Sequence, residues 1–221
     1  MKNAGKHAQT LKALAKKWSK TKAGDRPEEA PVRAAVLAVL RRDTPDATVD
    51  QALSLLEGEY ADFNELRVAT ELELHDLLGG LYKDIDERAG ELIDVLMGIF
   101  DTRGRLHLDD VAEMNRREQR PALKAIAGLS PYVESYIALC SFGIGTIPID
   151  ESGMAYLIDI DVLEDDVDAA EAHKFVESNL KADECWPFFV KLREETIGKP
   201  KRAKTTAKKT TKKTAKKTAK K

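Results

Sequence analysis

The segment from residue 123 to residue 150 combines a glycine turn with a carboxylate that follows a proline. Gly128-Leu129-Ser130-Pro131 separates two apolar helical runs, and Pro148-Ile149-Asp150 follows a second loop that contains glycine. A short glycine turn between two helices points backbone N–H groups outward at the start of the second helix, which makes an anion site. Such a site can bind a phosphate without any net positive charge in the domain. Gly128 and Ser130 are therefore candidate phosphate-binding residues.

The last 23 residues, 199–221, contain twelve Lys or Arg and no acidic residue. They consist almost wholly of Lys, Thr and Ala, so they cannot bury enough apolar surface to offset the entropy of ordering. We expect a disordered cationic arm that binds the phosphate backbone of DNA, with a merely solubilising tail as the alternative. The cations expected to contact DNA are Lys208, Lys209, Lys212, Lys213, Lys216 and Lys217.

The formal net charge of −2 conceals an uneven distribution of charge along the chain. Residues 1–24 carry seven Lys and no acid, whereas residues 25–198 carry 17 basic and 38 acidic residues, a net charge of −21. The arms can therefore bind a polyanion while the body is repelled by it on net charge. Any contact of the body with DNA must be local and geometric. Docking of the basic arms on the acidic body, until DNA competes, is a further hypothesis.

The composition also excludes several classes of protein. No apolar run approaches the roughly 18 residues of a membrane span, and no signal-peptide apolar stretch follows the basic N-terminus. Cys140 and Cys185 are the only cysteines, and two cysteines make neither a zinc site nor an iron–sulfur cluster unaided. The acidic cluster between Asp159 and Asp168 lacks the spacing of a calcium loop. We expect a cytoplasmic, nucleoid-associated protein with no metal, cofactor or membrane contact; the oligomeric state is left open.

Helical periodicity dominates the elements that must position these residues. Apolar residues recur at helical spacing most clearly from Asp86 to Phe100, and no convincing strand alternation is present. The runs predict an all-α domain of roughly eight to ten helices. We expect helices at residues 30–40, 48–60 (capped by Thr48), 86–100, 132–142, 154–162, 168–180 and 187–197, a short helix before Gly79, one or two helices over 108–127, and a connection at 62–68.

Composition divides the chain into three parts. Residues 1–29 form a basic N-terminal arm in which Leu11, Leu14 and Trp18 predict a short amphipathic helix. Residues 30–198 form the helical body. Residues 199–221 form the Lys/Thr/Ala-rich tail.

The order of these segments resembles the helix-hairpin-helix base-excision glycosylases, the endonuclease III superfamily. Gly128-Leu129-Ser130-Pro131-Tyr132 falls on the family's Leu-Pro-Gly-Val-Gly-Pro-Lys hairpin, and Pro148-Ile149-Asp150 falls on the segment that holds its catalytic aspartate. Tyr132 and Asp150 lie 18 positions apart, as do the family's lysine and aspartate. Residues 40–46 resemble Leu-Ser-Gln-Asn-Thr-x-Asp, and residues 62–68 are similar to Asp-Trp-Asn-Glu-Leu-Arg-Val. The resemblance covers about residues 9–198.

The resemblance implies a helix-hairpin-helix glycosylase fold that binds double-stranded DNA and removes a base. Asp150 would then stabilise the positive charge that develops on the deoxyribose, and would orient or deprotonate the attacking water. The base must first leave the stack, and Tyr132 would lie beside the flipped nucleoside. Arg42 stands where the family inserts a glutamine into the space left by the base.

Departures from the family's pattern limit the implied chemistry. Tyr132 replaces the lysine that forms a Schiff base, and a phenol cannot form an imine with a sugar aldehyde, so lyase chemistry by that route is excluded. Ser130 replaces the second hairpin glycine, Glu134 places a carboxylate where we expect the mouth of the phosphate site, and the four cluster cysteines are absent. The implied function is a monofunctional DNA glycosylase. The alternative is a glycosylase fold that has lost its chemistry and acts as a non-enzymatic nucleoid or DNA-binding protein.

Each of these residues also has a purely structural interpretation. Asp150 could simply cap the helix that follows it, and Tyr132 could be ordinary core. Ser130 with Pro131 is a suitable helix start without any ligand, and Gly128 could be only a helix C-cap.

Overall fold

The computed structural model describes residues 3–20 and 23–197, and this part of the chain forms twelve helices and no strand. The all-α prediction is therefore confirmed. The helices are α1 (Ala4–Trp18), α2 (Pro31–Arg41), α3 (Asp46–Glu59), α4 (Phe63–Arg67), α5 (Glu71–Leu78), α6 (Ile85–Arg103), α7 (Asp109–Glu113), α8 (Arg116–Lys124), α9 (Pro131–Cys140), α10 (Glu151–Asp159), α11 (Ala169–Asn179) and α12 (Ala182–Thr196). None of them has the length and apolarity needed to cross a bilayer.

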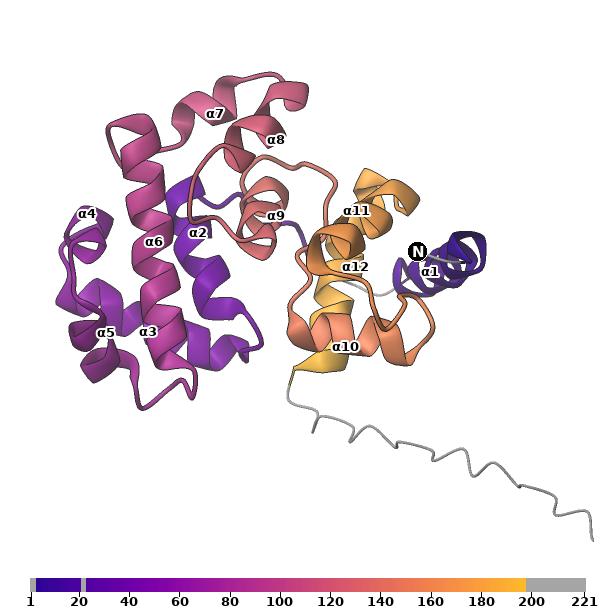
Figure 1. The fold of residues 1–221 in the computed structure, drawn as a ribbon, viewed down its shortest axis with the longest axis horizontal. Helices are drawn as coiled ribbons and strands as arrows, with labels where there is room; N and C mark the ends of the chain where they lie inside the picture. The colour runs from indigo at the N-terminus through magenta and orange to yellow at the C-terminus, as the bar shows by residue number, and fades with distance from the viewer. Residues whose placement is uncertain (1–2, 21–22, 198–221) are drawn as a thin grey trace, which may run out of the picture.

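The helices gather in two groups that lie side by side (Figure 1). Helices α2 to α9 form one group, in which α2 packs against both α6 and α9. The other group contains α10, α11 and α12 together with α1, which contacts both α11 and α12. The first helix of the chain thus completes a group that is otherwise built from its C-terminal part.

Helices α2 and α9 are the most deeply buried elements. Every residue of α2 from Ala34 to Leu40 is buried, as is every residue of α9 from Tyr132 to Cys140. A helix that is apolar on all sides belongs inside a helical protein, which explains why these two pack together. Since α9 is central, Tyr132 at its start is fixed by packing from several directions.

The N-terminal segment is tied to both groups. Trp18 is 3% exposed, and its ring lies 4.7 Å from the ring of Phe188 in α12. Further along, Arg26 Nη1 donates to the carbonyl oxygens of Leu139 and Cys140 at 3.0 and 2.9 Å, which caps the C-terminal end of α9. The predicted amphipathic helix is present as α1, with its apolar face against the body.

The predicted elements and the observed ones differ at several places. Helices α10 and α12 begin at residues 151 and 182, before the predicted starts at 154 and 187. Thr48 is not a cap, because α3 begins at Asp46, directly after Pro45 in an extended conformation. The segment 62–68 is not a plain connection but contains α4, whose cap Asp62 accepts hydrogen bonds from the N–H groups of Asn64 and Glu65. The described residues hold more helices than the eight to ten expected, because five-residue helices are too short to show a period.

The predicted boundaries at residues 29 and 198 stay predictions. The cationic tail, with Lys208, Lys209, Lys212, Lys213, Lys216 and Lys217, lies outside the described residues.

Candidate active site

The turn between α8 and α9 rests directly on the backbone of α6. Gly128 has a φ of 82°, and a Cβ there would come within 2.5 Å of the carbonyl oxygen of Asp94. A Cβ on Gly98, also in α6, would overlap the carbonyl oxygen of Ala127. Only glycine fits either position, since a side chain would collide with backbone and, at Gly128, would also require a left-handed conformation. This backbone-to-backbone contact fixes the position of the turn relative to α6.

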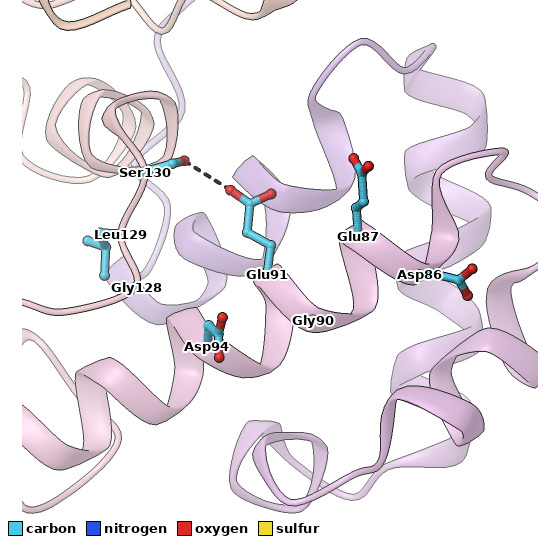
Figure 2. Close-up of a pocket in the computed structure, with 8 residues that line it drawn as sticks. All are labelled: Asp86, Glu87, Gly90, Glu91, Asp94, Gly128, Leu129 and Ser130. Carbon is cyan, nitrogen blue, oxygen red and sulfur yellow. Dashed lines mark hydrogen bonds between the residues drawn. The ribbon is translucent and has the colours of Figure 1, made fainter.

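One carboxylate contacts two of the residues predicted to bind DNA, and Figure 2 shows its contact with Ser130. Glu91 Oε1 accepts a hydrogen bond from Ser130 Oγ at 3.0 Å, and Glu91 Oε2 lies 2.6 Å from Arg42 Nη1. Ser130 is also the N-cap of α9, because its Oγ accepts the N–H of Val133. The structure therefore brings Arg42 and the hairpin turn to the same place on α6, although the sequence alone gives no hint of Glu91 between them.

An open groove of about 580 Å³ lies at this turn. Figure 2 shows acidic side chains of α6 along it. The lining residues are Asp86, Glu87, Gly90, Glu91, Asp94, Gly128, Leu129 and Ser130. Four carboxylates beside the predicted phosphate site oppose the binding of an anion, so the N–H groups of the turn must act against the local field.

Glu134 does not add to this negative charge. Its side chain is 9% exposed, and its Oε1 lies 2.6 Å from Arg120 Nε, while Arg120 Nη1 also binds Glu177 at 3.0 Å. Burial lowers the pKa of Arg120, but Glu177 and Glu134 raise it, and the net pKa lies above the ordinary value. Arg120 of α8 thus holds Glu134, which is not among the residues that line the groove at the turn. The carboxylates near the turn belong to α6.

Asp150 lies at the start of α10 and is only 6% exposed. Its Oδ1 accepts the N–H of Gly153 at 2.8 Å, and its Oδ2 accepts the N–H of Asp43 at 3.1 Å. Burial raises the pKa of Asp150 and the neighbouring charge of Asp43 raises it further, whereas the two backbone N–H groups and Arg193 lower it. The net pKa lies above the ordinary carboxyl value. Capping uses one carboxylate oxygen, and the second is aimed by a backbone N–H from another part of the chain.

Tyr132 brings a buried hydroxyl to the same region. The residue is 5% exposed, and its hydroxyl has no hydrogen-bond partner among the described residues. Burial raises the pKa of Tyr132 far above its ordinary value, and the charge of Asp150 raises it further. The phenol therefore stays protonated, and its hydroxyl can donate a proton in a hydrogen bond or accept one. The structure places Tyr132 and Asp150 within electrostatic reach of each other.

Two buried arginines from different helices fix the turn between α2 and α3. Arg193 of α12 donates to the carbonyl oxygens of Arg41 and Thr44 at 2.9 and 2.8 Å. Arg88 of α6 donates to the carbonyl oxygen of Arg42 at 3.1 Å. Sequence reasoning missed both arginines, because a charged residue inside a helical pattern is expected on the surface until tertiary packing buries it.

The residues present do not fit an iron–sulfur cluster. Cys140 and Cys185 are both buried and free, and they lie on α9 and α12 as single cysteines, whereas a cluster needs four thiolates. Burial raises the pKa of each thiol to about 12. Within residues 3–20 and 23–197, no three His, Cys, Asp or Glu side chains gather as a metal site.

Comparison with known proteins finds likeness in structure only. No family model matches the chain, and no curated protein matches it significantly in sequence. A trapped endonuclease III–DNA covalent intermediate matches with a TM-score of 0.60 at 14% identity, over 87% of this chain and 85% of that one. The 8-oxoguanine glycosylase/lyase of Clostridium acetobutylicum, in complex with double-stranded DNA, matches with 0.62 at 18% identity, over 89% and 72%. The 3-methyladenine DNA glycosylase of H. pylori, bound to 1,N6-ethenoadenine, matches with 0.58 at 15% identity, over 86% and 97%.

Each of these matches covers more than four fifths of this chain. At such low identity the likeness concerns the architecture. The chain therefore has the fold of the helix-hairpin-helix DNA glycosylase superfamily.

Proposed function

We propose that the protein is a monofunctional DNA glycosylase of base-excision repair, which hydrolyses the N-glycosidic bond of a flipped base in double-stranded DNA. The observation that carries this proposal is the environment of Asp150. Its carboxylate is buried and accepts hydrogen bonds from two backbone N–H groups. Its charge raises the pKa of Tyr132, whose buried hydroxyl has no hydrogen-bond partner among the described residues. A carboxylate that served only as a helix cap would need neither the burial nor the second N–H.

The chemistry follows from the charge that develops during bond cleavage. As the glycosidic bond breaks, its electron pair leaves with the base and the sugar becomes cationic. A fixed carboxylate in a site of low dielectric stabilises that cation, and it can accept the proton of the water that attacks the sugar. Tyr132 can pack against the extruded nucleoside and donate its proton in a hydrogen bond. It cannot form an imine with the sugar, so the proposed reaction ends with an intact abasic strand.

DNA binding in this proposal uses three parts of the chain. Ser130 and Gly128 offer the N–H groups of the hairpin to one phosphate, and Arg42 fills the space that the flipped base leaves. Arg42 and Ser130 contact the same carboxylate, so they would meet one stretch of duplex. The lysines of the tail supply the attraction that the acidic body lacks.

The test is a panel of duplex oligonucleotides with single lesions or mismatches, each treated with hot alkali after incubation with the protein. Hot alkali cuts abasic strands, so it reports base release without any lyase. We expect cleavage on at least one duplex and no adduct after treatment with borohydride. Asp150→Asn should lower base release by about 100-fold or more, since it removes the charge that meets the cation.

Glu151→Gln is the matched control, because it removes a carboxylate from the exposed neighbouring position of the same helix start. It should leave base release unchanged, and both variants should bind duplex DNA as the unmodified chain does. Base release that survives Asp150→Asn would defeat the assignment.

One observation favours a second candidate, a non-enzymatic DNA-binding protein on a glycosylase fold. The groove at the hairpin is lined by four carboxylates, which is unfavourable for tight phosphate binding at this turn. This candidate predicts no product on any duplex of the panel. It also predicts binding that disappears when salt is raised or when residues 199–221 are removed.

A further inference from the structure

Asp43 and the start of α10 hold each other through a reciprocal pair of hydrogen bonds. The backbone N–H of Asp43 donates to Asp150 Oδ2 at 3.1 Å. In return, the Oδ1 of Asp43 accepts the N–H of Ser152 at 2.8 Å. The two aspartates therefore cross-link the turn after α2 to the helix that carries the candidate catalytic carboxylate.

The backbone at Asp43 is strained, and its surroundings impose the strain. Asp43 has a φ of 50°, a left-handed conformation that is unfavourable for most residues and is tolerated by Asp and Asn. Arg193 binds the carbonyl groups of Arg41 and Thr44, one on each side of Asp43, and Arg88 binds that of Arg42. Such strain persists only where the fold over-determines a position, and such positions concentrate at functional sites.

Only a side chain with a hydrogen-bond acceptor can close this pair, and the sequence has a carboxylate where an amide would also serve. Any residue would supply the backbone N–H, but Ser152 needs the acceptor. The charge of Asp43 faces the buried Asp150, together with Arg193 from α12 and Tyr132 from α9. Two carboxylates in one site resist simultaneous ionisation, so this choice has a chemical consequence as well as a structural one.

We propose that Asp43 is the positioning residue of the reaction, which locks the orientation of the Asp150 carboxylate from the turn between α2 and α3. This rests on the proposed function. Asp43 does not touch the substrate; it acts through Asp150. The charge of Asp43 also raises the pH at which Asp150 loses its proton. The fall in the rate of base release at low pH should therefore depend on both residues.

Three variants separate the effect of the hydrogen bond between Asp43 and Ser152 from the effect of the charge of Asp43. Asp43→Asn keeps the acceptor and tolerates the left-handed backbone, but it removes the charge. Asp43→Ala removes the acceptor and the charge together. Asp50→Asn is the control for net charge, because Asp50 is exposed on α3. Thermal unfolding of each variant shows that it is folded.

The first measurement does not need activity. The protein is labelled with 13C at the aspartate carboxyl groups, the signal of Asp150 is assigned from Asp150→Asn, and its titration is followed by NMR. We expect the pKa of Asp150 to fall in Asp43→Asn and to stay unchanged in Asp50→Asn. An unchanged titration in Asp43→Asn would overturn the coupling.

The second measurement is single-turnover base release against pH, on a duplex identified by the panel. Asp43→Ala should lower the rate constant about tenfold to a hundredfold at neutral pH, with unchanged DNA affinity, because a misplaced carboxylate stabilises the cation poorly. Asp43→Asn should restore most of that rate and shift the acid limb to lower pH. A rate in Asp43→Ala equal to that of the unmodified chain would overturn the proposal. A higher rate would overturn it as well, and would show that the contact restrains the reaction.

The two proposals fail differently. If the unmodified protein releases no base from any duplex, the proposed function fails, while the NMR titration still decides whether Asp43 controls Asp150. If base release depends on Asp150 but ignores Asp43, only the positioning proposal fails.

Discussion

Two tyrosines one helical turn apart in α9 show how differently a buried hydroxyl can be treated. Tyr136 Oη accepts a hydrogen bond from Arg41 Nη1 at 2.8 Å, whereas the hydroxyl of Tyr132 has no partner in the described part of the chain. Their rings stack with centroids 6.4 Å apart, so they share most of their packing environment. A buried hydroxyl without a partner costs about 1–3 kcal/mol, which a ligand could recover by offering an acceptor.

Replacing each tyrosine by phenylalanine should therefore have opposite effects. Tyr132→Phe should raise the free energy of unfolding by up to about 1 kcal/mol, because it removes an unsatisfied polar group. Tyr136→Phe, the matched control, should lower it by about 1–2 kcal/mol, because it removes the hydroxyl to which Arg41 Nη1 donates. Urea denaturation of both variants measures this difference. A loss of stability in Tyr132→Phe equal to that in Tyr136→Phe would mean that both hydroxyls are bonded.

At the scale of elements, the hairpin and α6 form one unit. The turn before α9 lies so close to α6 that Gly98 and Gly128 have no room for a side chain. Gly90 occupies the same helix, yet a Cβ there would meet only the side chain of Glu71, at 3.5 Å. Gly98 and Gly90 lie in the same helix, so the difference in space around them comes from what packs against α6 and not from the helix itself.

The pair Gly98→Ala and Gly90→Ala tests this contact. Gly98→Ala should destabilise the fold by about 1–3 kcal/mol or more, since the helix and the turn must separate. Gly90→Ala should stabilise it by up to about 1 kcal/mol, because alanine favours a helix interior. Calorimetry on both variants measures the change in the free energy of unfolding and its sign. Equal changes would show that α6 and the turn are not in contact.

Sequence patterns found the long helices, and they placed the site through a resemblance in residue order. The run from Asp86 to Phe100 lies wholly within α6, because its apolar spacing repeats over several turns. Asp43, Arg88 and Arg193 escaped, because what they do depends on contacts across more than 40 residues of chain. A helical period reports which face is buried; it does not report which charged side chain reaches a distant carbonyl.

At the scale of the whole molecule, the positive charge is concentrated in a different part of the chain from the helical body. The described body carries the fold, the candidate site and the acidic groove, while the densest positive charge lies in residues 199–221, beyond α12. On this distribution of charge, we expect long-range attraction to a polyanion to come from the tail rather than from the acidic body.

Removal of residues 199–221 should leave the chemistry intact and weaken the encounter with DNA. Each neutralised phosphate contributes about 0.9 to the slope of log affinity against log salt, so the slope should become less steep by about 5–10. Fluorescence anisotropy on a labelled duplex over a series of KCl concentrations measures it. The single-turnover rate at saturating DNA should match that of the full chain. An unaltered salt slope would show that the tail does not bind DNA.

The way the first helix packs has a practical consequence for anyone who shortens this protein. Residues 1–29 look dispensable by composition, yet Leu11, Ala15 and Trp18 are buried against the C-terminal helices, and Arg26 closes the end of α9. A fragment that starts at residue 30 would expose the apolar surface of α11 and α12 that α1 covers. It would also leave the carbonyl groups at the end of α9 without the hydrogen bonds from Arg26. Trimming from the opposite end would leave all of these contacts in place.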